Sequence, residues 1–231
     1  MTFQQMQDLF NQRMDQAGSP GFRKIQIDRL LNWGYDIWYI INRKKFNRDQ
    51  SNTVNMTHLL RPFTFENTSI ITVVGDGTNI PDFRDLAKMK GQWQKTDCRG
   101  KLMFWAYDKS KPVLADRNIV SVPLSKVDVQ TQDPFNQAND EYPFYKHDNN
   151  GTNRVITIQS TTVPLKVTGT YFKILQTIDT IGAPDTPFEA QDYVARQVVD
   201  IAKILGKGDV DDYPAVKQAM GESELSQVVT P

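Results

Sequence analysis

The residues that could do chemistry in this 231-residue chain are few and far apart in sequence. Its two histidines, His58 and His147, have no Gly-X-Ser-X-Gly nucleophile turn to accompany them. Cys98 is the only cysteine, and Arg99 beside it could lower the pKa of the thiol, but neither histidine is close enough in sequence to be its base. We therefore predict a protein that is not an enzyme, with no catalytic residue and with His58 as a core or surface histidine.

Metal and phosphate ligands are not predicted either. Carboxylates cluster at Asp209, Asp211 and Asp212, but proline and aliphatic residues follow where a calcium loop needs oxygen ligands. The stretch "GDGTNIP" lacks both the Walker lysine and the three-glycine dinucleotide fingerprint, and indicates a turn. We expect no metal and no cofactor.

A basic cluster ends the most apolar stretch of the chain, "QIDRLLNWGYDIWYIINRKKFNRDQ", and consists of Arg43, Lys44, Lys45 and Arg48. As a solvated helix end, each cation would complement the helix dipole by about 0.3–1 kcal/mol. Alternatively, the cluster faces DNA phosphates or an acidic protein surface. Lys and Arg together equal Asp and Glu at 27 each, so net charge does not choose between the two.

Six aromatic residues are candidate subunit-interface residues, because aromatic side chains are enriched where protein surfaces bury each other. Two belong to the apolar stretch and four to the polar segment "DPFNQANDEYPFYKHD", which is long for a passive connection. The alternative for the second group is packing of a loop onto a sheet. The candidates are Trp33, Trp38, Phe135, Tyr142, Phe144 and Tyr145.

Residues 1–62 have the apolar spacing of helices. Phe3, Met6, Phe10 and Met14 fall on one helix face, and a second helix is predicted from Arg23 to Phe46. The apolar stripe of this second helix is wider than one partner could cover, and Gly34 within it suggests close approach of another backbone. "NTVNMTHLLRPF" predicts a further short helix, ended by Pro62.

Residues 63–180 are predicted to be β structure, with strands at "SIITVV", "GKLMFWAYD" and "NRVITIQS". "LKVTGTYFKIL" is the expected partner of the last strand, with a bulge at Gly169. Residues 181–231 predict a helix that starts at Pro187, carries Tyr193 and Val194 on its inner side and ends at Gly206. A short helix and a tail follow.

These elements predict an α+β fold in which an N-terminal helical hairpin and a C-terminal helix pack together, with an antiparallel β-sandwich-like domain inserted between them. Residues 1–62 and 181–231 would form one helical subdomain, and 63–180 the β-rich region. Apolar runs are far shorter than the ~20 residues that span a membrane, so no membrane partner is expected.

The order of these segments resembles the head-to-tail connector or adaptor proteins of short-tailed double-stranded-DNA bacteriophages. This family includes tail-ring and gatekeeper-like proteins, the ring proteins of crAss-like phages in particular. The similar segments span about residues 5–206 and are "LLNWGYDIWYIINRKKF", "MTHLLRPF", "IITVVGDGTNIPDFRDLAKM", "DPFNQANDEYPFY" and "DYVARQVVDIAKIL".

The resemblance implies a non-enzymatic virion protein, made in the bacterial host cytoplasm, that forms a homo-oligomeric ring in the phage neck or tail. The ring would be twelvefold, a dodecamer, and would join the portal protein to other tail ring proteins around the channel for double-stranded DNA. Two alternatives stay open: a nucleic-acid-binding module that uses the basic cluster of Arg43 to Arg48, and a small enzyme with an unrecognised site.

Overall fold

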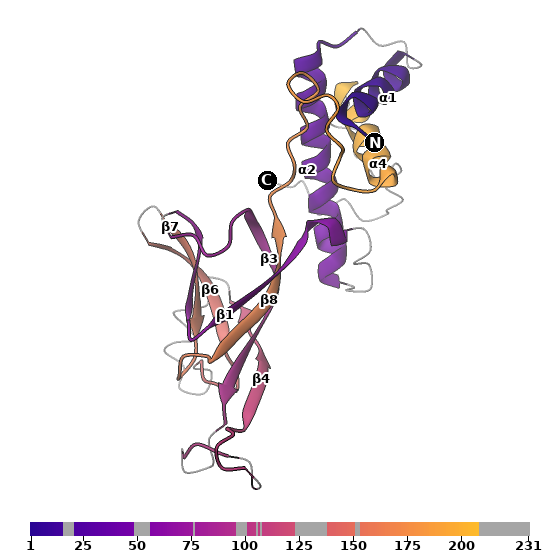
Figure 1. Cartoon of the computed structure of the whole chain (residues 1–231). Helices are drawn as coiled ribbons and strands as arrows, with labels where there is room; N and C mark the ends of the chain where they lie inside the picture. Colours follow the sequence, from indigo (N-terminus) through magenta and orange to yellow (C-terminus); the bar gives the residue numbers. More distant parts are fainter. Residues whose placement is uncertain are drawn as a thin grey trace. The chain divides into compact units, whose positions relative to one another are not determined.

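The computed structural model describes residues 1–15, 21–48, 56–75, 77–95, 101–104, 106, 108–122, 138–150 and 153–207. The chain divides into two compact units (Figure 1). The helical unit comprises Met1–His58 and Leu175–Pro231, and the β unit comprises Leu59–Ile174. The predicted α+β class is confirmed, with helices at both ends of the chain and an inserted, largely antiparallel β region.

The described helices of the helical unit are α1 (Phe3–Asp15), α2 (Lys24–Arg48) and α4 (Asp192–Gly206). Each of the three contacts the other two. The predicted inner face of α1 is confirmed, since Phe3, Met6, Phe10 and Met14 are all buried. Among the described residues, no helix is both long and apolar enough to cross a membrane.

Helix α4 begins later than predicted, at Asp192, although it ends at Gly206 as expected. Pro187 instead forms a β-bridge with Thr2, because the segment before the helix runs beside the N-terminus. Val194 faces the core as predicted, whereas Tyr193 is partly exposed. The short helix and tail predicted after Gly206 lie outside the described residues, as do the carboxylates of 209–212.

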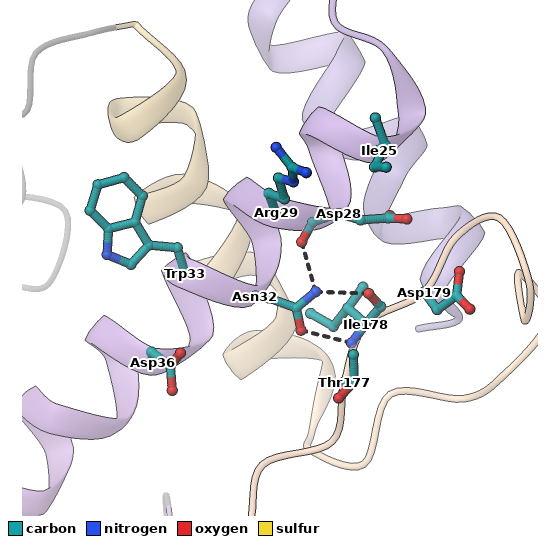
Figure 2. A pocket seen from close by; sticks show the side chains of 9 residues that line it. All are labelled: Ile25, Asp28, Arg29, Asn32, Trp33, Asp36, Thr177, Ile178 and Asp179. Carbon is teal, nitrogen blue, oxygen red and sulfur yellow. Dashed lines mark hydrogen bonds between the residues drawn. The ribbon is translucent and has the colours of Figure 1, made fainter.

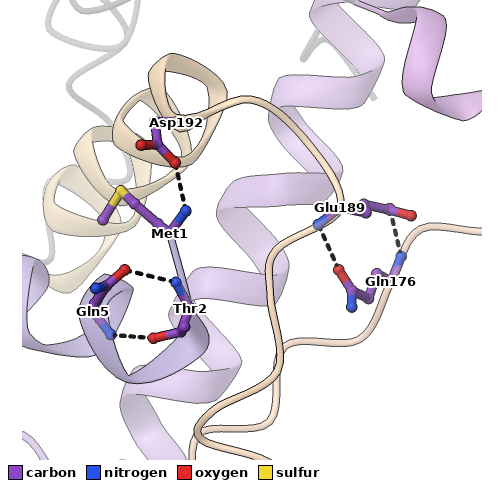
Figure 3. A network of polar contacts seen from close by, with 6 residues as sticks. All are labelled: Met1, Thr2, Gln5, Gln176, Glu189 and Asp192. Carbon is purple, nitrogen blue, oxygen red and sulfur yellow. Dashed lines mark hydrogen bonds and ion pairs between the residues drawn. The ribbon is translucent and has the colours of Figure 1, made fainter.

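Polar contacts fix the start of the chain and the approach to α4 (Figure 3). The amino group of Met1 pairs with Asp192 in the first turn of α4. Thr2 and Gln5 form a reciprocal capping box: the Thr2 amide donates to Gln5 Oε1 at 2.9 Å, and the Gln5 amide donates to Thr2 Oγ1 at 3.3 Å. Both members of this box can be read from the Thr-X-X-Gln sequence that begins α1.

Gly34 lies at a close approach of the α2 and α4 backbones, as its position in the apolar stripe predicts. A Cβ atom built on Gly34 would lie 2.8 Å from the carbonyl oxygen of Val198 and 3.2 Å from the amide nitrogen of Ala202. Both are backbone atoms of α4 and cannot rotate away. The helix pair therefore depends on the absence of a side chain at this position.

We expect Gly34→Ala to destabilise the protein, although alanine is the better helix former by about 1 kcal/mol. The added methyl group has to separate α2 from α4, and overpacking of this kind costs typically about 1–3 kcal/mol. Urea unfolding followed by circular dichroism measures the change. Gly21→Ala, at a glycine with open space around its Cβ direction, is the control. A Gly34→Ala protein that is more stable than wild type would contradict the expectation.

The β unit contains two four-stranded sheets, with strand orders β1-β8-β3-β4 and β2-β7-β6-β5. All pairs are antiparallel except β5 with β6. One hydrophobic cluster draws on both sheets, including Trp93 and Tyr171 from the first and Ile71 and Ile156 from the second. The strands are β1 (Leu60–Glu66), β2 (Ile70–Val74), β3 (Phe83–Gln94), β4 (Leu114–Asn118), β5 (Val120–Ser121), β6 (Phe144–Asn150), β7 (Asn153–Gln159) and β8 (Lys166–Lys173).

The short helix predicted before Pro62 is shorter than expected, and its first residues, 52–55, lie outside the described residues. Residues 56–59 form a single 3₁₀ turn, and β1 begins at Leu60 and runs through Pro62. Strand β1 lies at the edge of its sheet, where a residue without an N–H group leaves no gap in a central ladder. A proline is tolerated both after the end of a helix and in an edge strand, so its presence alone does not distinguish the two.

The predicted pairing of the two strong late strands is wrong. Strand β7 pairs with β2 and β6, whereas β8 lies in the other sheet between β1 and β3. Gly169 of β8 forms no bulge, since its register with Phe63 and Met89 is continuous. A Cβ atom there would clash with the Lys88 carbonyl oxygen and lie 2.6 Å from the Phe63 ring, so this glycine permits the close approach of both.

In the β region, one predicted strand belongs to a connection, and one predicted connection contains a strand. Among its described residues, the predicted strand "GKLMFWAYD" shows single bridge residues at Leu102 and Phe104, the latter paired with Pro112, and no continuous strand. In contrast, the end of the segment predicted as a connection forms β6, in the interior of its sheet. The "GDGT" turn after β2 is confirmed, and both of its glycines, Gly75 and Gly77, have positive φ.

Candidate interaction surfaces

A shallow groove of about 540 Å³ follows the N-terminal half of α2 (Figure 2). One wall is α2 and the other is the extended segment 177–179 of the same unit. We call this the α2 groove. It is lined by Ile25, Asp28, Arg29, Asn32, Trp33, Asp36, Thr177, Ile178 and Asp179.

Two polar side chains of α2 hold the second wall in place. The Asn32 side-chain amide donates to the Ile178 carbonyl at 2.8 Å, and Asn32 Oδ1 accepts from the Ile178 amide at 2.9 Å (Figure 2). One turn earlier, Asp28 Oδ1 accepts from the amide and the hydroxyl of Thr180 at 3.2 and 2.6 Å. Because Ile178 and Thr180 are each held by two hydrogen bonds with α2 side chains, the groove is formed before anything binds in it.

Helix α2 keeps apolar side chains exposed on the groove side after its other side has packed. Ile25 is 52% exposed, Trp33 48% and Ile40 41%, and their spacing places them roughly on one helix face. Leu31 and Tyr35 are buried on the opposite side. A Trp side chain left half in water is a candidate contact site, because aromatic rings dominate the binding energy of interfaces.

The other interface candidates divide sharply. Trp38 is fully buried, with its Nε1 donating to Gln197 Oε1 at 2.9 Å, so its assignment as an interface residue is corrected to a core residue. Phe144 is likewise buried on β6, and Tyr145 packs against the β core. Tyr142 is 74% exposed, and Phe135 lies outside the described residues.

The basic cluster at the end of α2 is not a uniformly solvated patch. Lys44 is exposed, but Arg43 and Lys45 are half-buried. The Arg43 guanidinium lies 5.7 Å from the centre of the buried Phe46 ring, a cation–π distance. The side chain of Arg48 is outside the described part of the chain.

His58 belongs to a hydrogen-bonded chain inside the helical unit. The Tyr35 hydroxyl donates its proton to Glu189 Oε1 at 2.8 Å, so the His58 Nε2–H must donate to the Tyr35 oxygen, 3.1 Å away. The His58 ring also lies against Trp38, with centroids 5.9 Å apart. These contacts join the 3₁₀ turn to α2 and to the segment before α4. Cys98 lies outside the described residues.

His147 lies on β6, apart from His58, and its surroundings disfavour the charged form. Burial lowers the pKa of His147 below its usual value, Arg154 lowers it further, and Asp85 partly opposes them. The native state therefore binds the proton more weakly than the unfolded chain, whose histidine pKa is about 6.5. The free energy of unfolding should consequently fall as the pH drops below about 6.5.

We expect the stability of the β unit to be greater at pH 7.5 than at pH 5.5, with part of the difference removed by His147→Gln. Thermal unfolding at both pH values measures it. His58→Gln is the control, since it removes the other histidine. An unchanged pH dependence in His147→Gln would contradict the assignment to this residue.

A second exposed apolar surface lies in the β3–β4 connection, which extends past the other strands of the β unit (Figure 1). Leu102, Met103 and Phe104 are 40–55% exposed. They are braced by backbone hydrogen bonds from Met103 to Lys95 and from Val113 to Met103, at 2.8 and 2.9 Å. We call these three residues, with the flanking Lys95, Lys101, Lys109 and Lys111, the hairpin tip.

The apolar residues of the hairpin tip fall in the segment "GKLMFWAYD", whose apolar residues predict a strand. The apolar run is flanked on both sides by lysines, which favours a surface site over a buried one. The turn that follows is built by Asp108, whose Oδ1 accepts from the Ser110 amide and hydroxyl at 3.0 and 2.5 Å. These hydrogen bonds lower the pKa of Asp108 and keep it ionised among the lysines.

Among the described residues, no group of three or more His, Cys, Asp or Glu side chains could hold a metal ion. The arrangement that does stand out is a pair of exposed apolar surfaces, one on each unit. No family model matches the chain, and no curated protein is similar to it in sequence.

Proposed function

We propose that this protein is a virion structural protein that forms a homo-oligomeric ring in the neck or tail of a short-tailed double-stranded-DNA phage. The ring joins the portal protein to the next tail ring around the DNA channel. The proposal is motivated by the resemblance to connector proteins. The observation that carries it is the second apolar face of α2, with Trp33 and Ile25 half exposed.

This face takes no part in the described core of the helical unit, since Ile25, Trp33 and Ile40 stay 41–52% exposed. The opposite side of α2 already packs through Leu31, Tyr35 and Trp38, all of which are buried. Apolar surface left outside the core is typical of a subunit interface, and obligate interfaces commonly bury roughly 2,000–5,000 Å². A ring uses such surfaces in heterologous contacts, in which one face meets a different face of the next copy.

Cryo-electron microscopy of the phage particle that contains this protein tests the proposal. The expected result is a closed ring, twelvefold if the portal symmetry is followed, with the portal on one side and a tail protein on the other. A particle with no symmetric copies of the chain in its neck or tail would defeat it. The proposal would also be defeated if the monomer only bound DNA, in a salt-sensitive way, and lost that binding in the Lys44→Glu variant.

A further inference from the structure

The two exposed apolar surfaces have opposite charge around their edges. The hairpin tip carries Leu102, Met103 and Phe104 among four lysines. Among the described residues of its turn, the carboxylate is that of Asp108. The Lys111 side chain is 74% exposed, and its Nζ lies 3.4 Å from Asp108 Oδ2. An apolar centre with a basic rim is therefore presented at the end of the β unit.

The α2 groove has the reverse character. Its apolar residues are Ile25, Trp33 and Ile178, and its charged rim contains three carboxylates and one guanidinium: Asp28, Asp36, Asp179 and Arg29. The excess of carboxylates favours a basic partner. A groove of about 540 Å³ is large enough for one or two apolar side chains of a protruding loop.

We propose that the hairpin tip of one copy docks into the α2 groove of the next copy in the ring, with Phe104 and Leu102 covering Trp33 and Ile25. The tip lysines then face the groove carboxylates, Asp36 and Asp179 among them. This inference rests on the proposed function, because it requires a second copy. The occupant is a second copy because both apolar surfaces are exposed on the single chain and the charged side chains around them are opposite in sign.

Both surfaces are pre-organised, which lowers the entropy cost of the contact. Asn32 and Asp28 fix the groove wall through paired hydrogen bonds. The tip is braced by the Lys95, Met103 and Val113 backbone bonds, at 2.7–2.9 Å, and by the Asp108 turn. These hydrogen bonds limit the backbone freedom that the described residues of each surface lose on docking.

The contact is heterologous, since a surface of the β unit meets a surface of the helical unit. Repetition of such a contact generates a closed ring when the rotation between copies closes, and a helical filament when it does not. Each copy would contribute one tip and one groove, so every interface in the ring would be the same. A single substitution therefore acts at all of them.

Site-specific photo-cross-linking tests the contact directly. Benzoylphenylalanine in place of Phe104 is incorporated into assembled particles prepared from mixed ¹⁴N and ¹⁵N protein, and cross-linked peptides are identified by mass spectrometry. We expect mixed-isotope links from position 104 to α2 between Ile25 and Asp36. The same probe in place of Val163, another exposed apolar residue of the β unit, is the control and should not reach α2. Links within one chain only, links to another segment or protein, or no link at all would overturn the inference.

Charge exchange supplies a second, independent measurement. Asp36→Lys and Lys109→Glu should each reduce incorporation into particles at least about tenfold, and the double variant should recover most of the loss. Additive losses in the double variant would overturn the inference. Circular dichroism and thermal unfolding check that each variant is folded. Rings that form in every variant would refute the contact and leave the proposed function standing, whereas wild-type protein absent from neck and tail rings would refute the function itself.

Discussion

Trp38→Ala is expected to lower the free energy of unfolding of the helical unit by about 3–5 kcal/mol, the usual range for truncating a buried tryptophan. The Trp38 side chain is fully buried, and its ring lies against Tyr35 and His58. Truncation also leaves Gln197 Oε1 without its indole donor, 2.9 Å away in the wild type. The cavity and the lost hydrogen bond act in the same direction.

Trp33→Ala is the matched control, because it removes the same side chain from the same helix. Trp33 is half exposed, so its removal should change the stability of the monomer by less than about 1 kcal/mol. Hydrogen exchange of the α2 and α4 amides follows the helical unit separately from the β unit. Equal effects of the two substitutions would contradict the assignment of Trp38 to the core and Trp33 to the surface.

The helices were predictable because each has an apolar stripe that its own spacing reveals. All four predicted inner residues of α1 are buried, and α2 begins and ends within two residues of the expected positions. Gly34 was assigned correctly to a close backbone approach. These signals lie within one segment of the sequence, so they can be recognised without knowing which element packs against it.

The strands were predictable only where β-branched residues are dense. Strands β2, β7 and β8, "IITVV", "NRVITIQ" and "KVTGTYFK", are confirmed as strands, although the partner predicted for β8 is wrong. Strands β1, β3 and β6 contain proline, lysine, glycine or asparagine at positions that sheet pairing tolerates, and local propensity does not identify them. The exchange of partners between β7 and β8 depends on contacts distant in sequence, and no pattern within either strand encodes it.

Of the two tryptophans of α2 predicted to lie at an interface, Trp33 is exposed and Trp38 is buried, because contacts distant in sequence decide which edge of the apolar stripe is covered. Trp33 and Trp38 are five residues apart, which separates them by about 140° around a helix. The sequence indicates that the apolar stripe is too wide for one partner, but not which edge of it faces α4. The positions of Val198 and Ala202 against Gly34 decide this, and they place Trp38 inside and Trp33 outside.

Asn32→Leu is expected to destabilise the helical unit by roughly 2–4 kcal/mol, although leucine is close in volume and a better helix former. Asn32 satisfies both the carbonyl and the amide of Ile178, whose side chain is buried. Leucine leaves both backbone groups without those partners, and an unsatisfied buried polar group costs about 1–3 kcal/mol. The wall of the α2 groove should loosen as a result.

Amide hydrogen exchange at Ile178 measures this loosening directly, and it should accelerate in Asn32→Leu together with exchange at Thr180. Asn32→Asp separates the two bonds, because an aspartate keeps the Oδ1 acceptor for the Ile178 amide and loses the donor to its carbonyl. Exchange at Ile178 should then stay slower than in Asn32→Leu while stability still falls. If Ile178 exchanged at the wild-type rate in Asn32→Leu, segment 177–179 would be held by its own packing, and the groove would not depend on the side chains of α2 for its shape.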